Sequence, residues 1–297
     1  MSYKEFLTQI EKQVQNRMGK EARICIHSVT KNNSVILDGL SILEYGDNVS
    51  PAIYLNSFYQ EYLSGETMEQ IVNRILFYYH QGKKVHRVDT SFYTDIRKAR
   101  KRMVCRVINR EKNQKLLEEV PYRPFLNLAV VYYYLLEQKE IGSAAILIRK
   151  EHLNMWGMEE KEIHAIAMEN TRKLLPCEFL SMEEMIYSML GENDFSICNE
   201  EAPLYVLTNN EKSYGAVWMT DGAVLEMIAE QLDGDYYVLP SSIHECMVVP
   251  VRAGIERRIL AEMVEEMNMT QVEPEEVLAD NIYCYVQEEK CLKMIQL

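Results

Sequence analysis

The chain has 297 residues, of which 47% are hydrophobic and 26% charged, and this is the composition of an ordinary globular protein. It holds only 12 glycines and 8 prolines, which excludes collagen-like and low-complexity chains. The formal net charge of −13 opposes non-specific binding to nucleic acid. No apolar run is long enough to span a bilayer, and the N-terminal segment lacks the apolar core of a signal peptide. We therefore expect a cytoplasmic protein without membrane contact.

The first 82 residues predict a small antiparallel sheet with helices. Residues 1–22 have the spacing of an amphipathic helix. Residues 23–55 read as a three-stranded meander, because "KNN" and "EYGDNVSP" supply turn residues between apolar runs. Two helices follow, the first capped by Asn56 and ended by Gly65, the second ended by Gly82.

A basic segment comes next, although the chain as a whole is acidic. Residues 82–115 hold twelve Lys and Arg side chains against three acidic ones, and their core is "DIRKARKRMVCRVINREKNQK". One interpretation is a binding face for phosphate or an acidic partner. The other, which we favour, is a basic helical segment over 83–115 that is solvated or docked on the acidic half of the same protein. The candidate binding side chains are Lys98, Arg100, Lys101, Arg102 and Arg106. Nucleic-acid binding through this segment is not favoured, because no recognisable module or set of stacking aromatics accompanies it.

The remaining residues predict further α+β modules. "NLAVVYYYLLE" and "GSAAILIRK" read as a central hairpin, followed by helices up to about residue 190, one of which starts with a capping box at Ser181 and Glu184. From residue 203 the order is two strands, a helix, two strands, a helix and a closing hairpin, and we expect "PLYVLTN" to pair with "YGAVWMT". The fold class is α+β with mostly antiparallel sheets covered by helices. The expected modules are 1–118, 119–200 and 201–297.

The stretch "VLPSSIHECMVVP", residues 238–250, collects the best candidates for chemistry. His244 has Ser242, Glu245 and Cys246 as neighbours, which suggests a general base and a nucleophile. Catalytic triads, however, are built from residues that are distant in sequence, and no G-x-S-x-G motif occurs. We therefore interpret residues 240–245 as a polar turn between two buried strands.

Motifs for metals and cofactors are missing from the sequence. The seven cysteines are far apart and form no C-x-x-C pair, which favours buried reduced thiols. The sequence contains no H-E-x-x-H, no G-x-x-x-x-G-K-[ST] and no G-x-G-x-x-G. We expect neither a metal site nor a cofactor.

Several stretches in order carry a resemblance. They include "PAIYLNSFYQEYLSGETMEQI", "WGMEEKEIHAIAMENT", "LYVLTNNEKSYGAVWM" and "YYVLPSSIHECMVVP". The chain resembles, over nearly its full length, a domain-of-unknown-function family of cytoplasmic proteins of roughly 300 residues from gut anaerobic bacteria. Its second half is more distantly similar to another uncharacterised bacterial family. The resemblance implies a shared α+β core and brings no catalytic residues with it.

Three hypotheses about function remain. The leading one is a non-enzymatic cytoplasmic bacterial protein that binds an unknown protein or ligand through residues 83–115 or the loop 240–245. The first alternative is a hydrolase-like enzyme that uses His244 with a neighbouring serine or cysteine. The second is an acidic inhibitor that mimics the charge of nucleic acid through the carboxylates of residues 151–297.

Overall fold

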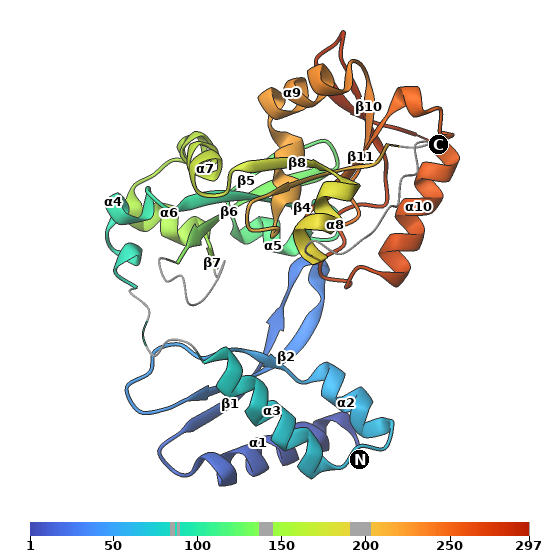
Figure 1. The fold of residues 1–297 in the computed structure, drawn as a ribbon. Helices are drawn as coiled ribbons and strands as arrows, with labels where there is room; N and C mark the ends of the chain where they lie inside the picture. The colour runs from blue at the N-terminus through green and yellow to red at the C-terminus, as the bar shows by residue number, and fades with distance from the viewer. Residues whose placement is uncertain (84–86, 88–89, 137–144, 191–202, 297) are drawn as a thin grey trace. The chain divides into compact units, whose positions relative to one another are not determined.

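The computed structural model describes residues 1–83, 87, 90–136, 145–190 and 203–296 (Figure 1). The chain divides into two units. The first is formed by Met1–Thr90 with Leu136–Ala144, and the second by Ser91–Leu135 with Ala145–Leu297. Helices and antiparallel sheets occur in both, so the expected α+β class is confirmed.

The first unit is a three-stranded sheet with three helices. The strands pair antiparallel in the order β1-β2-β3, which confirms the expected meander. Side chains of all three helices and all three strands meet in one core, for example Phe6, Leu40 and Ile75. Capping boxes at Ser2 and Thr67 fix the starts of two helices. The elements are α1 (Tyr3–Met18), β1 (Arg23–Thr30), β2 (Ile36–Leu43), β3 (Ile53–Tyr54), α2 (Asn56–Leu63) and α3 (Met68–Gly82).

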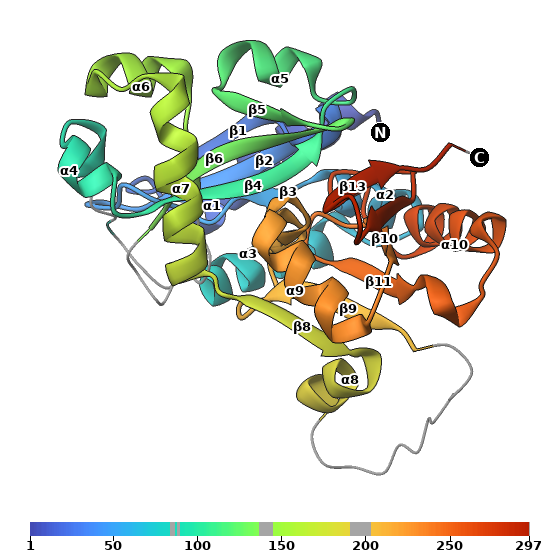
Figure 2. The same ribbon diagram turned by 90° about the horizontal axis from the view of Figure 1, so that it is seen from above.

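The second unit contains two sheets. In the four-stranded sheet the central strand β6 pairs with β4 on one side and with β5 and β7 on the other. Helix α7 lies across this sheet (Figure 2), and the Thr171 hydroxyl accepts the backbone N–H of Cys105 in β4 at 2.9 Å. The elements of this part are α4 (Ile96–Ala99), β4 (Met103–Asn109), α5 (Gln114–Glu119), β5 (Tyr122–Phe125), β6 (Leu128–Leu135), β7 (Ala145–Leu147), α6 (Lys150–Trp156) and α7 (Glu160–Leu174).

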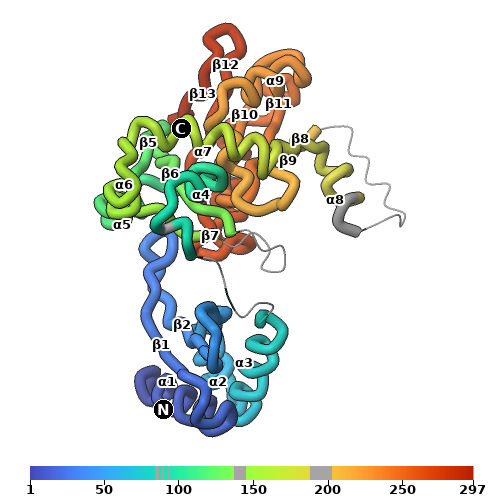
Figure 3. The backbone as a smooth tube through the Cα atoms, turned by 90° about the vertical axis from the view of Figure 1, so that its left-hand side faces the viewer, coloured from blue at the N-terminus to red at the C-terminus, as the bar shows by residue number. Residues whose placement is uncertain are grey.

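The six-stranded sheet has the order β13-β12-β10-β11-β9-β8, with antiparallel neighbours throughout. Its hairpin β12–β13 and its strand β8 lie at opposite ends (Figure 3). The Asp221 side chain caps α9 by accepting the backbone N–H of Ala223, and the expected capping box at Ser181 and Glu184 forms. The elements are β8 (Cys177–Ser181), α8 (Met182–Leu190), β9 (Tyr205–Asn209), η4 (Gly215–Thr220), α9 (Gly222–Leu232), β10 (Tyr236–Leu239), β11 (Cys246–Pro250), α10 (Arg257–Thr270), β12 (Tyr283–Val286) and β13 (Cys291–Met294).

Three expectations about local structure are corrected. Asn56 does not cap α2, because Leu55 holds the cap position and the Asn56 side chain accepts the backbone N–H of Asp38 at 2.9 Å instead. The segment 83–115 is not one basic helix, because its centre is the strand β4, whose seven residues are all buried. The run "MVCRVIN" is apolar and β-branched enough to form a sheet strand despite its arginine. The residues expected as a strand at "YGAVWMT" form the 3₁₀ helix η4 instead, which packs against β9 and α9.

The expected boundary at residue 118 lies in α5 and separates β4 from β6 along the chain, although these two strands pair in one sheet. The expected boundary at 200 lies outside the described residues, and β8 pairs with β9 from the other side of it. The division into the modules 1–118, 119–200 and 201–297 stays a prediction.

Candidate functional site

The loop 240–245 joins β10 and β11 and pairs with a second loop. The backbone N–H of Ile243 donates to the carbonyl of Glu276 at 2.9 Å, and the N–H of Leu278 donates to the carbonyl of Ser241 at 3.0 Å. Ser242 forms an isolated bridge with Val277. These backbone hydrogen bonds form a short ladder between the two loops. They satisfy backbone polar groups around Ser241 and Ser242, which are both buried.

Both ring nitrogens of His244 have partners. Nδ1 accepts the backbone N–H of Tyr214 at 3.2 Å, and Nε2 lies 3.2 Å from Oε1 of Glu276. Because Nδ1 acts as an acceptor, the proton of the neutral ring is on Nε2 and points at the carboxylate. The imidazole therefore orients the start of η4 and pairs with Glu276.

The neighbours of His244 are engaged elsewhere. The hydroxyl oxygen of Ser242 accepts the backbone N–H of His244 at 3.0 Å. The thiol of Cys246 is fully buried 3.8 Å from the sulfur of Met219, and burial raises its pKa well above the ordinary value. Burial also raises the pKa of Glu245, and Glu276 adds to this while His244 opposes it. Within the described part of the chain, no hydrogen bond joins the imidazole to the hydroxyl or to the thiol. A buried thiol with a raised pKa is also a poor nucleophile.

The five candidate basic side chains do not share one surface. Lys98, Arg100 and Lys101 are exposed around α4, with Arg97 beside them. Arg102 is half-buried and donates to the carbonyl of Leu135 at 2.7 Å.

Arg106 lies inside the protein, with 6% of its surface exposed. Its guanidinium carbon is 4.1 Å from the ring centroid of Tyr133 and 3.4 Å from that of Tyr214. Burial lowers its pKa, and the two tyrosines oppose this. Arg106 is therefore not reachable for an acidic partner at the surface.

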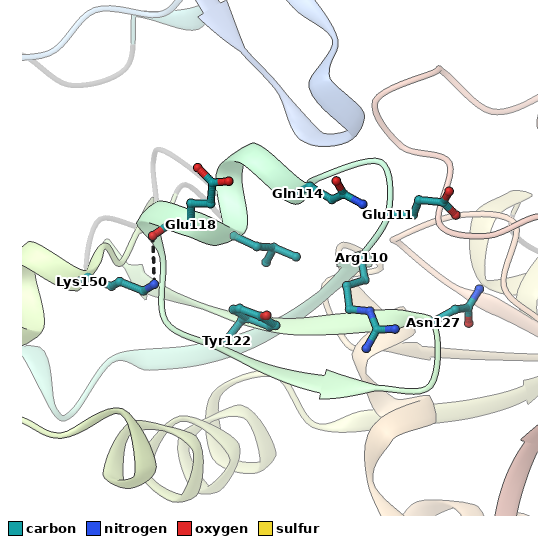
Figure 4. A pocket seen from close by; sticks show the side chains of 8 residues that line it. Arg110, Glu111, Gln114, Glu118, Tyr122, Asn127 and Lys150 are labelled. Atoms are coloured by element: carbon teal, nitrogen blue, oxygen red, sulfur yellow. Dashed lines mark hydrogen bonds between the residues drawn. The ribbon is translucent and has the colours of Figure 1, made fainter.

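A pocket of about 650 Å³ opens between α5 and the β5–β6 hairpin (Figure 4). The turn before α5 forms one wall. The Asn109 side chain accepts the N–H of Lys112 at 2.9 Å, and the Asn113 amide donates to the carbonyl of Asn109 at 2.8 Å. Since both asparagines are buried, this turn is fixed, and its residues Arg110 and Glu111 stay exposed and line the pocket.

The other end of the pocket is the start of α6. The Lys150 ammonium donates to the backbone carbonyl of Glu118 at 2.9 Å, and Arg149 pairs with Glu119. A cation at the C-terminal end of α5 is favoured by the unpaired carbonyls there. These contacts hold Lys150 at the edge of the pocket.

The pocket floor has an apolar part and a fixed amide. Tyr122 on β5 and Leu117 on α5 provide the apolar surface. The Asn127 side-chain amide donates to Oδ1 of Asn281 at 2.9 Å and accepts the Tyr283 hydroxyl at 2.5 Å. These two hydrogen bonds fix the side chain in the wall of the pocket. The pocket thus combines apolar surface with a few polar groups, as ligand sites do.

Reasoning from the sequence did not find this pocket. Arg110 belongs to the basic segment, but Tyr122 and Lys150 come from other elements, and their convergence is a property of the tertiary structure. The one local signal is the pair of asparagines four residues apart around "REK", which is typical of a side-chain-stabilised turn.

Among the described residues, no group of three or more His, Cys, Asp or Glu side chains is placed to hold a metal ion. In the same part of the chain, no helix has the length and apolar character needed to cross a membrane.

The fold and the pocket define an α+β protein with a polar, open ligand-sized site. The chain belongs to a family of unknown function, DUF5688, whose model matches residues 3–287. The expected membership of an uncharacterised family is confirmed. No curated protein and no solved structure matches the chain.

Proposed function

We propose that this protein is a non-enzymatic binding protein that holds a small polar ligand in the pocket between α5 and the β5–β6 hairpin. The observation that carries the proposal is the pocket itself, whose size of about 650 Å³ lies in the usual range for small-molecule sites. The polar groups around it come from the turn before α5, from α5, from the β5–β6 hairpin and from α6. Buried asparagines fix the turn, and the end of α5 holds the Lys150 ammonium.

A role in binding rather than catalysis is supported by the state of the residues nearest to a catalytic set. The nitrogens of His244 contact Tyr214 and Glu276, and the thiol of Cys246 is buried with a raised pKa. The hydrolase alternative and the nucleic-acid mimic remain hypotheses with less support. We also propose a cytoplasmic location, because the six cysteines in the described residues are all free thiols, as in a reducing compartment.

The test is the recovery of small molecules from a lysate of the native host. Gln114 is an exposed lining residue, so Gln114→Trp fills the pocket without touching the core. Lys115→Trp places the same indole on the same helix outside the pocket, and serves as the matched control. We expect mass spectrometry to detect a small molecule that co-purifies with the wild type and with the control but not with Gln114→Trp. A wild type that retains nothing, or a Gln114→Trp variant that retains the same molecule, contradicts the proposal.

A second site is supported by the exposed cations around α4. Lys98, Arg100 and Lys101 lie within four residues and are exposed, which favours an acidic protein partner over nucleic acid in a chain of net charge −13. We expect an immobilised polyglutamate to bind the wild type and to release it as salt is added. Arg100→Glu with Lys101→Glu should abolish this binding, and Lys4→Glu with Lys12→Glu on α1 should keep it. Equal loss of polyglutamate binding in both double variants would mean that binding depends on net charge alone, which contradicts a specific site at α4.

A further inference from the structure

The two cations of the pocket still have hydrogen-bond donors to offer. The Lys150 ammonium has three donors, and one of them is used by the carbonyl of Glu118. Within the described residues, no hydrogen bond or ion pair engages the Arg110 guanidinium, which carries five donors in a planar fork. Both side chains line the same pocket and can therefore bind an acceptor that enters it.

The carboxylates of the pocket lie on its outer side. Figure 4 shows the Glu118 carboxylate on the side of α5 away from Tyr122, and the Glu111 carboxylate directed away from Arg110. The Arg110 and Lys150 side chains instead reach to the level of the strands. The inner part of the pocket is therefore cationic, although its lining as a whole carries two charges of each sign.

The space between the two cations is apolar. In the view of Figure 4, the Tyr122 ring lies between Lys150 and Arg110. Leu117 of α5 lines the same pocket. Tyr122 is 36% exposed, which is enough for a flat group to rest on its ring.

We infer that the ligand of this pocket is a small dianion, with an apolar or aromatic body on Tyr122 and a carboxylate or phosphate group at each end, one bound by Arg110 and the other by Lys150. The inference rests on the proposed function, since it names the chemical class of the ligand for the same pocket. An arginine fork matches the two oxygens of a carboxylate or phosphate, and a lysine binds them as a point charge.

The experiment compares four probes that share one benzene body. They are para-phenylenediacetate with two carboxylates, phenylacetate with one, phenylacetamide with none, and phenethylamine with a positive charge. Dissociation constants are measured by ligand-observed NMR titration for the wild type, Arg110→Gln, Lys150→Gln and Gln114→Trp. Lys115→Gln, which removes an exposed cation of α5 outside the pocket, is the matched control.

We expect para-phenylenediacetate to bind most tightly and phenethylamine most weakly. Arg110→Gln and Lys150→Gln should each weaken binding of the dianion by about tenfold, because each removes the cation that holds one of its two anionic groups. Both variants should leave phenylacetamide unchanged, and Lys115→Gln should leave all four probes unchanged. Thermal unfolding of each variant verifies that the fold is kept.

Two results overturn the inference, and they differ in what they leave standing. If phenylacetamide binds as tightly as the dianion and Gln114→Trp removes both, the pocket is a ligand site but the ligand is not an anion. If no probe binds in a way that Gln114→Trp prevents, even at about millimolar concentration, the proposed function fails together with the inference.

Discussion

The guanidinium carbon of Arg106 lies 3.4 Å from the ring centroid of Tyr214, in the interior of the second unit. Arg106 belongs to the four-stranded sheet, and Tyr214 precedes η4, which packs against the six-stranded sheet. The contact therefore joins the two sheets of this unit. A buried cation next to aromatic rings keeps favourable electrostatic contact while its stem packs like an apolar side chain.

The first prediction concerns the packing role of Arg106. We expect Arg106→Ala to lower the free energy of unfolding by about 3 kcal/mol, because two tyrosine rings lose their neighbour. Arg106→Met keeps most of the volume and removes the cost of a buried charge, so it should lie within about 1 kcal/mol of the wild type. Urea denaturation measures both. Equal losses for the two variants would mean that the charge, and not the volume, stabilises the contact.

The His244 side chain should stabilise the folded chain. His244→Ala removes the acceptor of the Tyr214 N–H and the partner of Glu276, and we expect a loss of about 1–2 kcal/mol in the free energy of unfolding. Binding at the pocket between α5 and the β5–β6 hairpin should not change. A variant that keeps full stability but loses a hydrolytic activity of the purified protein would favour the enzyme hypothesis instead.

Gly215 should tolerate no side chain. A Cβ there would lie 2.5 Å from the Thr208 hydroxyl oxygen and 2.6 Å from the backbone nitrogen of Asn209. We expect Gly215→Ala to cost about 3 kcal/mol or to prevent folding, because backbone atoms of β9 would have to move. Gly222 in α9 is the control, since a Cβ there meets nothing within 4 Å. Gly222→Ala should leave stability unchanged or raise it by up to about 1 kcal/mol. Equal thermal midpoints for the two alanine variants would contradict the close approach at Gly215.

The raised pKa of Glu245 predicts that the stability of the folded chain depends on pH. Burial raises its pKa in the folded chain above the ordinary value of 4.5, so the folded state binds this proton more tightly than the unfolded chain does. The resulting stabilisation is fully present below pH 4.5 and is lost as the pH rises through the raised pKa.

Glu245→Gln cannot ionise, so its stability relative to the wild type should increase from pH 4.5 to neutral pH. The exposed Glu288→Gln is the control and should follow the wild type. Thermal unfolding across this range measures the difference, and a constant offset between wild type and Glu245→Gln would refute the prediction.

Most helices and strands could be predicted from local patterns. The capping box at Ser181 and the turns of the meander over 23–55 depend on residues within a few positions of one another. The prediction failed for "YGAVWMT", because its apolar run suits a strand as well as a buried 3₁₀ helix, and the local pattern does not distinguish the two.

The candidate site was harder to predict. The sequence placed Arg106 with the surface cations because charge runs are usually solvated, but the strand β4 carries it inside, next to two tyrosines from other elements. The turn at residues 240–245 was expected as a polar connection. Its pairing with residues 276–278 depends on a contact more than thirty positions away along the chain.

Local patterns predicted the α+β class, the capping box at Ser181 and the free thiols of the described cysteines, and ordered stretches along the chain predicted the family. The fold class and the capping box follow from periodicity and from hydrogen bonds between residues that are close in sequence, whereas the family follows from a resemblance. Only the tertiary structure decided which polar groups meet: His244 with Glu276, Arg106 with Tyr214, and Arg110 with Lys150 around one pocket. The physical reason is that a site forms where elements distant in sequence bring their side chains together, and that arrangement depends on the packing of the whole unit.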